Sequence, residues 1–471
     1  MAEEGGGGGV SMEEQIAEAA IKADMEHRGW SGGNGSYYKQ EFGSSKNGVH
    51  PHYEYHLTKE GLRIEKSPNV DNEDLTAQAS SMLSRLQSEV LNYWPRAIDD
   101  LFRKWQDAGL PSWGGLAMNA SWAKEGADEI RPGTTIDDNG SNLQVGNARL
   151  TADLGNLEKR TGQLAGNYAR AFSDNYVTPL PPVLQGQFAL GSVLAISLEA
   201  EKEIWLNTSR DLDSIRHHGL NAMRASAPKT GGGGVDAKVI VTVFAALAGA
   251  VAAFATAGGS LAVTAALTAA GAGAWSNLLE SPPKKEPEPV PLGAGHPRDV
   301  RTNIEKALEK LNEGIRTQEE FLQQILRGAN EVAGSKRGAF DLPPAAAEGT
   351  VLGKEQDVVV TAEIIAAITA QWIPCIAGDL RLARTKLGVD TAGSFDRPGG
   401  IGVGFNGPQP EFKALQETVI GLLGNTATEL DEAGAALLSA ARTIGLADQA
   451  AQAKYEGIAK QINDTNQNTA A

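Results

Sequence analysis

The amino-acid sequence predicts a mainly α-helical protein, an elongated multi-helix bundle with a central apolar helical hairpin and a small N-terminal β meander. Three observations predict this fold class. Apolar residues recur at spacings of three and four over long stretches after residue 74, which is typical of amphipathic helices. Aromatic and β-branched residues instead gather in residues 36–68, between turn signals. Finally, 41 consecutive residues, 239–279, carry no formal charge in a chain of 471 residues whose net charge is −16.

Composition argues against several classes of protein. With 42 basic and 58 acidic residues, the surface as a whole repels nucleic acid, which we do not expect as a partner. The single cysteine, Cys375, excludes an internal disulfide framework, and its apolar neighbours predict a buried small side chain. The first residues are acidic and glycine-rich rather than basic and then apolar, so we expect any export to use a non-Sec route.

Residues 1–72 are expected to contain a flexible N-terminus, a short helix and the small β element. Ser11 and Glu14 make a capping box that starts the helix. The β meander follows over residues 36–68, with an Asn-Gly and a Glu-Gly dipeptide as turn signals between its strands.

Three histidines and a glutamate alternate along this β element. The sequence HPHYEYH places them at positions 50, 52, 54 and 56. Side chains alternate along a strand with a period of two, so the four would project from one face. Imidazole and carboxylate groups together bind zinc or another divalent ion, which makes His50, His52 and His56 candidate metal ligands. A solvent-exposed polar face explains the same pattern, and we expect neither catalysis nor a cofactor here.

Residues 73–230 are expected to form the first part of the bundle. The spacing predicts a helix over 75–105 that is divided or kinked at Pro95, because proline cannot donate the backbone hydrogen bond of a helix interior. Further amphipathic helices are predicted over 150–172, before a PLPP sequence, and over 183–225, before a tetraglycine. Long helices of this kind pack best as an elongated bundle.

Residues 231–280 contain the uncharged run and are expected to form the apolar helical hairpin. Gly258 and Gly259 divide the run into two arms that would be about 28 and about 24 Å long as helices, close to the ~30 Å thickness of membrane hydrocarbon. Small residues at every fourth position would let the arms pack closely. Together with the two glycines, the candidate residues of a membrane hairpin are Val239, Ile240, Val243, Phe244, Leu247, Val251 and Phe254.

Three interpretations of the uncharged run are open. It is sheltered in the bundle, it inserts into a membrane only under some conditions, or it is a permanent transmembrane anchor, because a helix that is apolar all round is either a core helix or a membrane span. Lysines at 238 and at 284–285 would leave both ends in the same aqueous compartment. The glycine-rich and proline-rich flanks are typical of hinges, through which a sheltered hairpin could swing out.

Residues 281–299 are expected to be an extended, polyproline-like linker, because alternating prolines deny the chain a regular ladder of hydrogen bonds. Residues 300–471 then form the second part of the bundle and begin with a heptad stripe in which Gln318 is the only polar position. The apolar positions of this stripe are Ile304, Leu308, Leu311, Ile315, Leu322, Ile325, Ala329 and Val332.

The rest of the second part is predicted to contain two more helices and a loop. An apolar-rich helix over 357–388 is broken near Pro374, and a long Gly/Pro loop occupies 393–410. The last helix covers roughly 411–462 and becomes rich in alanine toward its end.

An alanine-rich amphipathic pattern marks residues 427–462, at Leu438, Ala440, Ala441, Asp448, Ala450 and Ala451. It resembles the end of small actinobacterial helical-hairpin proteins that the ESX, or type VII, system secretes. The Trp-x-Gly turn that joins the two helices in that family has a counterpart at Trp113 and Gly115, after a predicted long helix. The family's export signal pairs a tyrosine with an acidic residue four positions later, but Ala459 stands in that position after Tyr455.

We therefore expect a non-enzymatic, secreted or secretion-associated helical interaction protein of a type VII-like system, with membrane activity through the central hairpin. The resemblance implies a large multi-helix relative or associate of such substrates, exported alone or with a partner. Its amphipathic helices predict a protein partner or self-association. The alternatives are an α-helical pore-forming toxin component and a cytoplasmic or particle-associated scaffold. The expected location is accordingly the medium or the cell surface, or else the cytoplasm.

Overall fold

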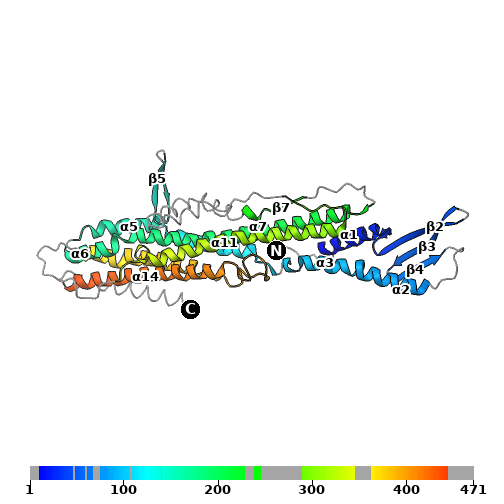
Figure 1. The fold of residues 1–471 in the computed structure, drawn as a ribbon. Helices are drawn as coiled ribbons and strands as arrows, with labels where there is room; N and C mark the ends of the chain where they lie inside the picture. The colour runs from blue at the N-terminus through cyan, green and yellow to red at the C-terminus, as the bar shows by residue number, and fades with distance from the viewer. Residues whose placement is uncertain are drawn as a thin grey trace.

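A computed structural model of the protein describes residues 10–45, 48–58, 61–66, 75–106, 109–138, 141–164, 166–228, 238–245, 289–344 and 362–443. These residues form a long, narrow rod whose helices run close to its long axis, with a β-sheet at one end (Figure 1). The predicted fold class, mainly α with a small N-terminal sheet, is confirmed.

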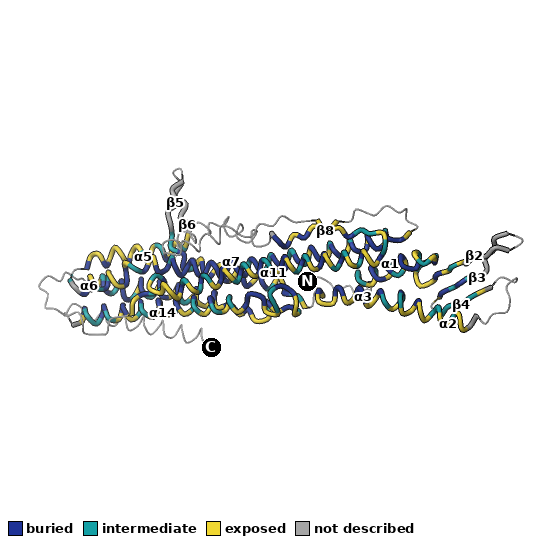
Figure 2. Tube along the Cα trace, in the orientation of Figure 1, coloured by how far each residue is buried: buried dark blue, intermediate teal, exposed yellow. Residues whose placement is uncertain are grey.

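The rod is organised around α7 (Leu180–Ala225), a helix of 46 residues. Prolines occupy its first turn, where a missing N–H group costs no hydrogen bond. Between Val183 and Leu198 almost every side chain is buried, and the buried positions continue as a band along the rod (Figure 2). The predicted helix over 183–225 is confirmed and begins three residues earlier than expected.

Two segments among the described residues are long and apolar enough to cross a membrane, Tyr168–Ala225 and Glu363–Leu387. Neither belongs to the uncharged run. In the first segment, which contains α7, 89% of the most apolar window is buried inside the rod. A helix that is apolar all round belongs in a core or a membrane, and here the other helices cover it.

Several helices enclose α7. Those that pack on it directly are α1 (Met12–His27), α4 (Trp113–Glu129), α11 (Pro297–Ser335) and α14 (Gln409–Thr443), and α13 (Ile373–Leu387) packs against both α4 and α14. The predicted heptad stripe on α11 is confirmed, since its apolar positions are buried apart from a half-buried Val332. Gln318 is buried within the stripe as its polar member.

The N-terminal region consists of α1 and an antiparallel sheet at the end of the rod. The capping box is confirmed, with the Glu14 backbone N–H donating to Ser11 Oγ at 3.1 Å. The predicted meander is also confirmed, with one short strand more than expected. In sheet order the strands are β1 (Ser31–Gly33), β2 (Ser36–Ser45), β3 (Gly48–Thr58) and β4 (Gly61–Lys66). Tyr55 and Leu57 are buried beneath the sheet.

The two predicted helix breaks at prolines are confirmed. A π-helical turn, η1 (Gln87–Leu91), separates α2 (Leu75–Leu86) from α3 (Tyr93–Phe102), and Pro95 lies in the first turn of α3. In the same way η8 (Ile368–Trp372) precedes α13, whose first turn contains Pro374. Each proline therefore begins a helix, at a position where its missing donor is tolerated, after a wider turn has redirected the chain.

A hairpin of β5 (Thr134–Asp138) and β6 (Ser141–Val145) projects sideways from the rod and was not predicted (Figure 1). The Asn139–Gly140 dipeptide between its strands is a hairpin signal that the sequence already contained. The predicted helix over 150–172 is divided into shorter elements. The remaining short elements are η2 (Arg103–Trp105), α5 (Ala148–Thr161), α6 (Asn167–Phe172), η4 (Ser173–Val177), η7 (Arg337–Ala339) and α12 (Ala362–Ala367).

Two smaller expectations are wrong. Trp113 and Gly115 do not form a turn between helices, because they lie in the first turn of α4, where the Gly115 N–H donates to the capping hydroxyl of Ser112 at 3.3 Å. Cys375 is exposed rather than buried, since the adjacent Ile376 faces the core in its place. The last predicted helix is confirmed as far as Thr443, and its remainder lies outside the described residues.

The predicted start of the apolar hairpin is also wrong. Residues 238–245 form a strand, β7 (Lys238–Ile240), and a short 3-10 turn, η6 (Val243–Ala245), instead of a helical arm. The β-branched sequence Val-Ile-Val favours an extended backbone. Its backbone pairs with another strand instead of forming helical hydrogen bonds. The rest of the hairpin, including Leu247, Val251, Phe254, Gly258 and Gly259, lies outside the described residues, and its helical structure stays a prediction.

Candidate functional site

The first residues of the uncharged run lie beside a short strand that follows the run in the sequence. β7 pairs antiparallel with β8 (Pro289–Pro291), and Val239 is opposite Val290. The expected linker without a ladder is therefore wrong at this point. Proline cannot donate to a ladder, but the N–H of Val290 can face β7 while its two proline neighbours fill the positions that need no donor. We call residues 238–245 together with 289–291 the neck, because they are the described residues that flank positions 246–288 in the sequence.

A buried carboxylate on α7 holds the neck from one side. Asp211 Oδ2 accepts hydrogen bonds from the backbone N–H groups of Thr242 at 2.6 Å and Val243 at 3.0 Å. Its Oδ1 accepts a third from the Thr242 hydroxyl at 2.8 Å. Burial raises the pKa of the Asp211 carboxyl, and the three hydrogen bonds act in the opposite direction. Asp211 thus takes the part of a helix cap for the 3-10 turn, since it satisfies N–H groups that the turn leaves unpaired.

α11 holds the same turn from the other side. The amide of Gln318, the polar member of the heptad stripe, donates to the Phe244 carbonyl at 2.9 Å. One helical turn earlier, Gly314 leaves room for Val243, whose side chain would collide with any Cβ at this position. The side chains of Val243 and Phe244 are buried against the bundle. The first residues of the uncharged run therefore belong to the protein core.

The neck divides the candidate hairpin residues into two groups. Val239, Val243 and Phe244 are buried at the neck, and Ile240 is exposed beside them. This bounds any membrane hairpin, which has to begin after Ala245. Sequence reasoning missed Asp211 and Gln318 as partners of the run, although a single glutamine in an apolar heptad stripe is a signal for a buried hydrogen bond.

A second cluster of buried charges ties the Gly/Pro loop to the bundle. Arg397, from the loop between α13 and α14, lies between Glu201 of α7 and Glu319 of α11, and all three side chains are shielded from solvent. The distance from Arg397 Nη2 to Glu201 Oε2 is 3.8 Å, and the guanidinium pairs closely with Glu319. Arg397 also stacks 4.8 Å from the ring centroid of Trp205, which donates to Glu201 at 2.9 Å.

Glycines make this arrangement sterically feasible. Gly402 and Gly407 have φ values of 58° and 51°, in the left-handed region that favours glycine. A Cβ at Gly407 would collide with the Arg397 guanidinium, and one at Gly402 with the Glu319 carboxylate. The predicted Gly/Pro loop therefore packs closely over buried charged side chains. Sequence reasoning predicted the loop but missed these charges.

The electrostatics of the cluster indicate a structural role. Burial raises the pKa of Glu201, against the opposing effects of Arg397 and Trp205. Burial likewise lowers the pKa of Arg397, against the effect of Glu201. A substrate cannot reach side chains that have no exposed surface in this conformation. Buried ion pairs contribute little net stability but strongly disfavour arrangements that separate them, so the cluster specifies how the loop docks.

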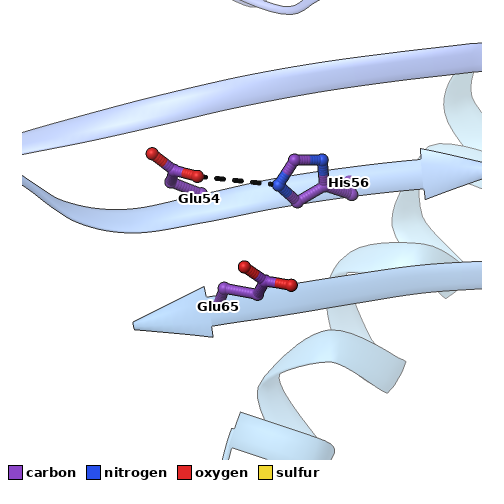
Figure 3. Close-up of side chains that lie close together, drawn as sticks. All are labelled: Glu54, His56 and Glu65. Carbon is purple, nitrogen blue, oxygen red and sulfur yellow. Dashed lines mark ion pairs between the residues drawn. The ribbon is translucent and has the colours of Figure 1, made fainter. Parts of the chain in front are cut away.

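The predicted metal ligands are only partly brought together. Glu54 and His56 on β3 and Glu65 on β4 gather on the sheet face shown in Figure 3, with candidate ligand atoms within 4.8 Å of one another. His56 Nε2 is 3.7 Å from Glu54 Oε2, and Glu54 lies directly opposite Glu65 in the sheet register. The structure thus brings His56 together with a glutamate that was not predicted.

The backbone of β3 is irregular near the other two histidines. The register between β2 and β3 shifts between Glu41 and Phe42, so a bulge interrupts β3 between its 48–51 and 53–58 parts. The side chains of His50 and His52 lie outside the described residues. A cation is already present, because Arg63 stands opposite His56 and its Nη2 lies 3.1 Å from Glu65 Oε1. A divalent ion at this face would compete with Arg63 for that carboxylate.

α4 carries large apolar side chains that face solvent. Trp113, Met118 and Trp122 are each half exposed or more, whereas the opposite face of the helix is buried against α7. Trp113 thus begins an exposed apolar surface rather than a turn motif. Large aromatic side chains on a helix surface are the kind that contribute most to protein interfaces.

Comparisons with protein-family models, with curated proteins and with solved structures find no match for this chain.

Replacing Gly314 by alanine tests the close packing at the neck. The new Cβ would collide with Val243, so we expect the free energy of unfolding to fall by about 1–3 kcal/mol, as overpacked cores do. Gly334→Ala is the matched control on the same helix, because nothing lies within 4 Å of its Cβ, and it should be neutral or stabilising. Urea denaturation measures both variants. Equal stabilities would contradict the packing of the neck against α11.

Arg397→Met removes the cation of the buried cluster. Two buried carboxylates are then left unpaired, and we expect a loss of about 3–5 kcal/mol of unfolding free energy near neutral pH. Because burial raises the pKa of Glu201, the folded state gains protons relative to the unfolded state as pH falls. The loss should therefore shrink toward about pH 5. Arg327→Met breaks an exposed pair with Glu411 and should cost only about 0–1 kcal/mol at either pH.

Zinc titration followed by calorimetry tests the sheet cluster as a metal site. We expect binding that His56→Ala removes, because imidazole is the only nitrogen ligand in the described cluster. Arg63→Gln should strengthen binding several-fold, because it frees Glu65 and removes a nearby positive charge. Binding that is unchanged in both variants would place the zinc elsewhere in the chain.

Proposed function

We propose that this protein is a non-enzymatic helical interaction protein, secreted or secretion-associated, that carries a membrane-active apolar run on a rigid rod. The neck is the single observation that supports this function most. It holds the first residues of a long uncharged segment on the bundle beside residues 289–291, through a strand pair, through hydrogen bonds that Asp211 accepts and through one that Gln318 donates.

The neck supports membrane action because it brings residues on the two sides of positions 246–288 close together. A segment that enters and leaves a bilayer from the same side needs its two ends close together, and Val239 and Val290 are paired. The 34 uncharged residues after Ala245, residues 246–279, are enough for one helix of roughly 20 residues, the length that spans hydrocarbon, and a shorter second arm. α7 is not the membrane element, because covering helices already satisfy its apolar surface.

The interaction role rests on the surface of the rod. The exposed tryptophans of α4 offer large apolar area to a protein partner, and the long helices present extended faces to a partner or to a second copy. Export by a type VII-like route is supported by the alanine-rich helix pattern near the end of the chain. Fractionation of the producing cells into medium, membrane and cytosol checks this part of the proposal.

Leakage of dye from anionic liposomes tests membrane activity. We expect the full-length protein to release dye, and Phe254→Asp to reduce release at least roughly tenfold, because a charge at the centre of an inserted helix costs about 2.5–3.5 kcal/mol. Ile240→Asp is the matched control, since Ile240 is exposed at the neck and should stay outside any membrane segment. No leakage by the full-length protein, or equal loss in the two variants, would contradict the proposal.

A further inference from the structure

Two histidines meet where three helices join. His27 is the last residue of α1, and His296 is the residue immediately before α11. Their rings lie 4.7 Å apart between centroids, with 33° between their planes. The third helix is α7, because His27 Nε2 lies 2.9 Å from the carbonyl of Ser226, just after the end of that helix.

Each histidine makes a hydrogen bond at a helix end, and the bond of His296 requires a neutral ring. A carbonyl only accepts, so His27 Nε2 donates to Ser226. His296 is the N-cap of α11, and its Nδ1 accepts from the backbone N–H of Arg298 at 3.2 Å. Acceptance at Nδ1 assigns the proton of neutral His296 to Nε2. A second proton on this ring would turn the cap acceptor into a donor that faces another donor.

The surroundings of His296 disfavour its protonated form. Burial lowers the pKa of His296, and the neighbouring His27 and Arg298 lower it further, while Asp24 and Asp299 act in the opposite direction. Asp24 is already engaged, since it accepts from Trp94 Nε1 at 2.9 Å and pairs with Arg28 at 3.0 Å. Arg298 itself stacks over Tyr93 of α3 at 5.7 Å. A cation at position 296 would also oppose the positive end of the α11 dipole.

The lowered pKa of His296 determines how the stability of this junction changes with pH. The pKa of His296 is lower in the folded protein than in the unfolded chain, so its contribution to stability is fully present above the ordinary imidazole value of about 6.5. That contribution is lost as pH falls through the lower, folded value. Mild acid therefore weakens this junction.

We propose that the His27–His296 pair is an acid-sensitive latch, which holds α1, α7 and α11 together near neutral pH and releases the neck when His296 is protonated. Protonation of His296 removes the acceptor that caps α11. As a regulator of membrane activity at the neck, the latch rests on the proposed membrane function. It also has a structural readout that does not depend on that function.

The latch is connected to the neck by a short segment. Residues 292–295 join β8 to His296, and Leu292 at the start of this segment is buried in the core. The first turn of α11 therefore positions Leu292 and, through it, the pairing of Val290 with Val239. When that turn frays, Leu292 loses the helix that follows it, and the hold on β8 weakens.

Amide hydrogen exchange tests the latch directly. Protection factors of residues 238–245 and 289–304 are compared at about pH 7.5 and about pH 5, on either side of the ordinary imidazole pKa. We expect them to fall roughly tenfold in the wild type at the lower pH, the factor that a lost helix cap implies. His296→Asn supplies a cap that does not titrate, so its protection should change little with pH. His27→Gln keeps a donor for Ser226 and should reduce the pH effect.

Control measurements separate the latch from general acid effects. His217→Asn, at an exposed position on α7, should behave like the wild type. Circular dichroism at neutral pH verifies that the variants fold. A tenfold fall that persists in His296→Asn would overturn the latch, as would a wild type whose protection does not change.

Liposome leakage at the two pH values distinguishes the latch from the proposed function. We expect wild-type leakage to rise at least several-fold at the lower pH and His296→Asn to suppress the rise. If exchange shows the pH-dependent opening but leakage is absent at both pH values, the membrane function fails and the latch stands. Acid-stimulated leakage that His296→Asn leaves unchanged would overturn the latch and retain the function.

Discussion

Over much of its length α7 has no side that tolerates water, and this constraint determines where the other helices lie. Burying it requires neighbours on every side, which α1, α4, α11 and α14 supply along successive parts of the rod. Two charged groups of α7 enter this core together with partners. Glu201 meets Arg397 and Trp205, and Asp211 meets the turn at the start of the uncharged run. Glu201 and Asp211 therefore mark the places on α7 where the Gly/Pro loop and the neck are docked.

The neck gives the uncharged run a defined relation to the rod. Its strand pair brings the start of the run next to residues 289–291, while Gly314 and Gln318 of α11 hold the following turn in the core. A membrane segment that begins at the neck would be attached to a rigid helical bundle instead of through flexible hinges. The histidine pair lies a few residues from β8, so one helix cap connects the protonation state of the junction to the neck.

Patterns that repeat along the chain were predictable, because periodicity reports burial directly. The heptad stripe of α11, the capping box at Ser11 and the helix starts at Pro95 and Pro374 follow from local sequence. The partners of isolated polar residues were not predictable. Arg397 and Glu201 are distant in sequence and meet only in the folded rod. The strand at Val239 was missed because a β-branched apolar run satisfies helix and strand patterns alike, and β8 decides between them.

Disulfide trapping across the neck tests the central claim most directly, namely that the start of the uncharged run pairs with residues 289–291 on the bundle. In a Cys375→Ser background, Val239→Cys and Val290→Cys face each other across an antiparallel pair, where Cβ atoms lie about 4.5–5.5 Å apart. The account predicts rapid and nearly complete cross-linking under mild oxidation in the folded protein, and slow cross-linking in urea. Equally slow cross-linking in both conditions would contradict it.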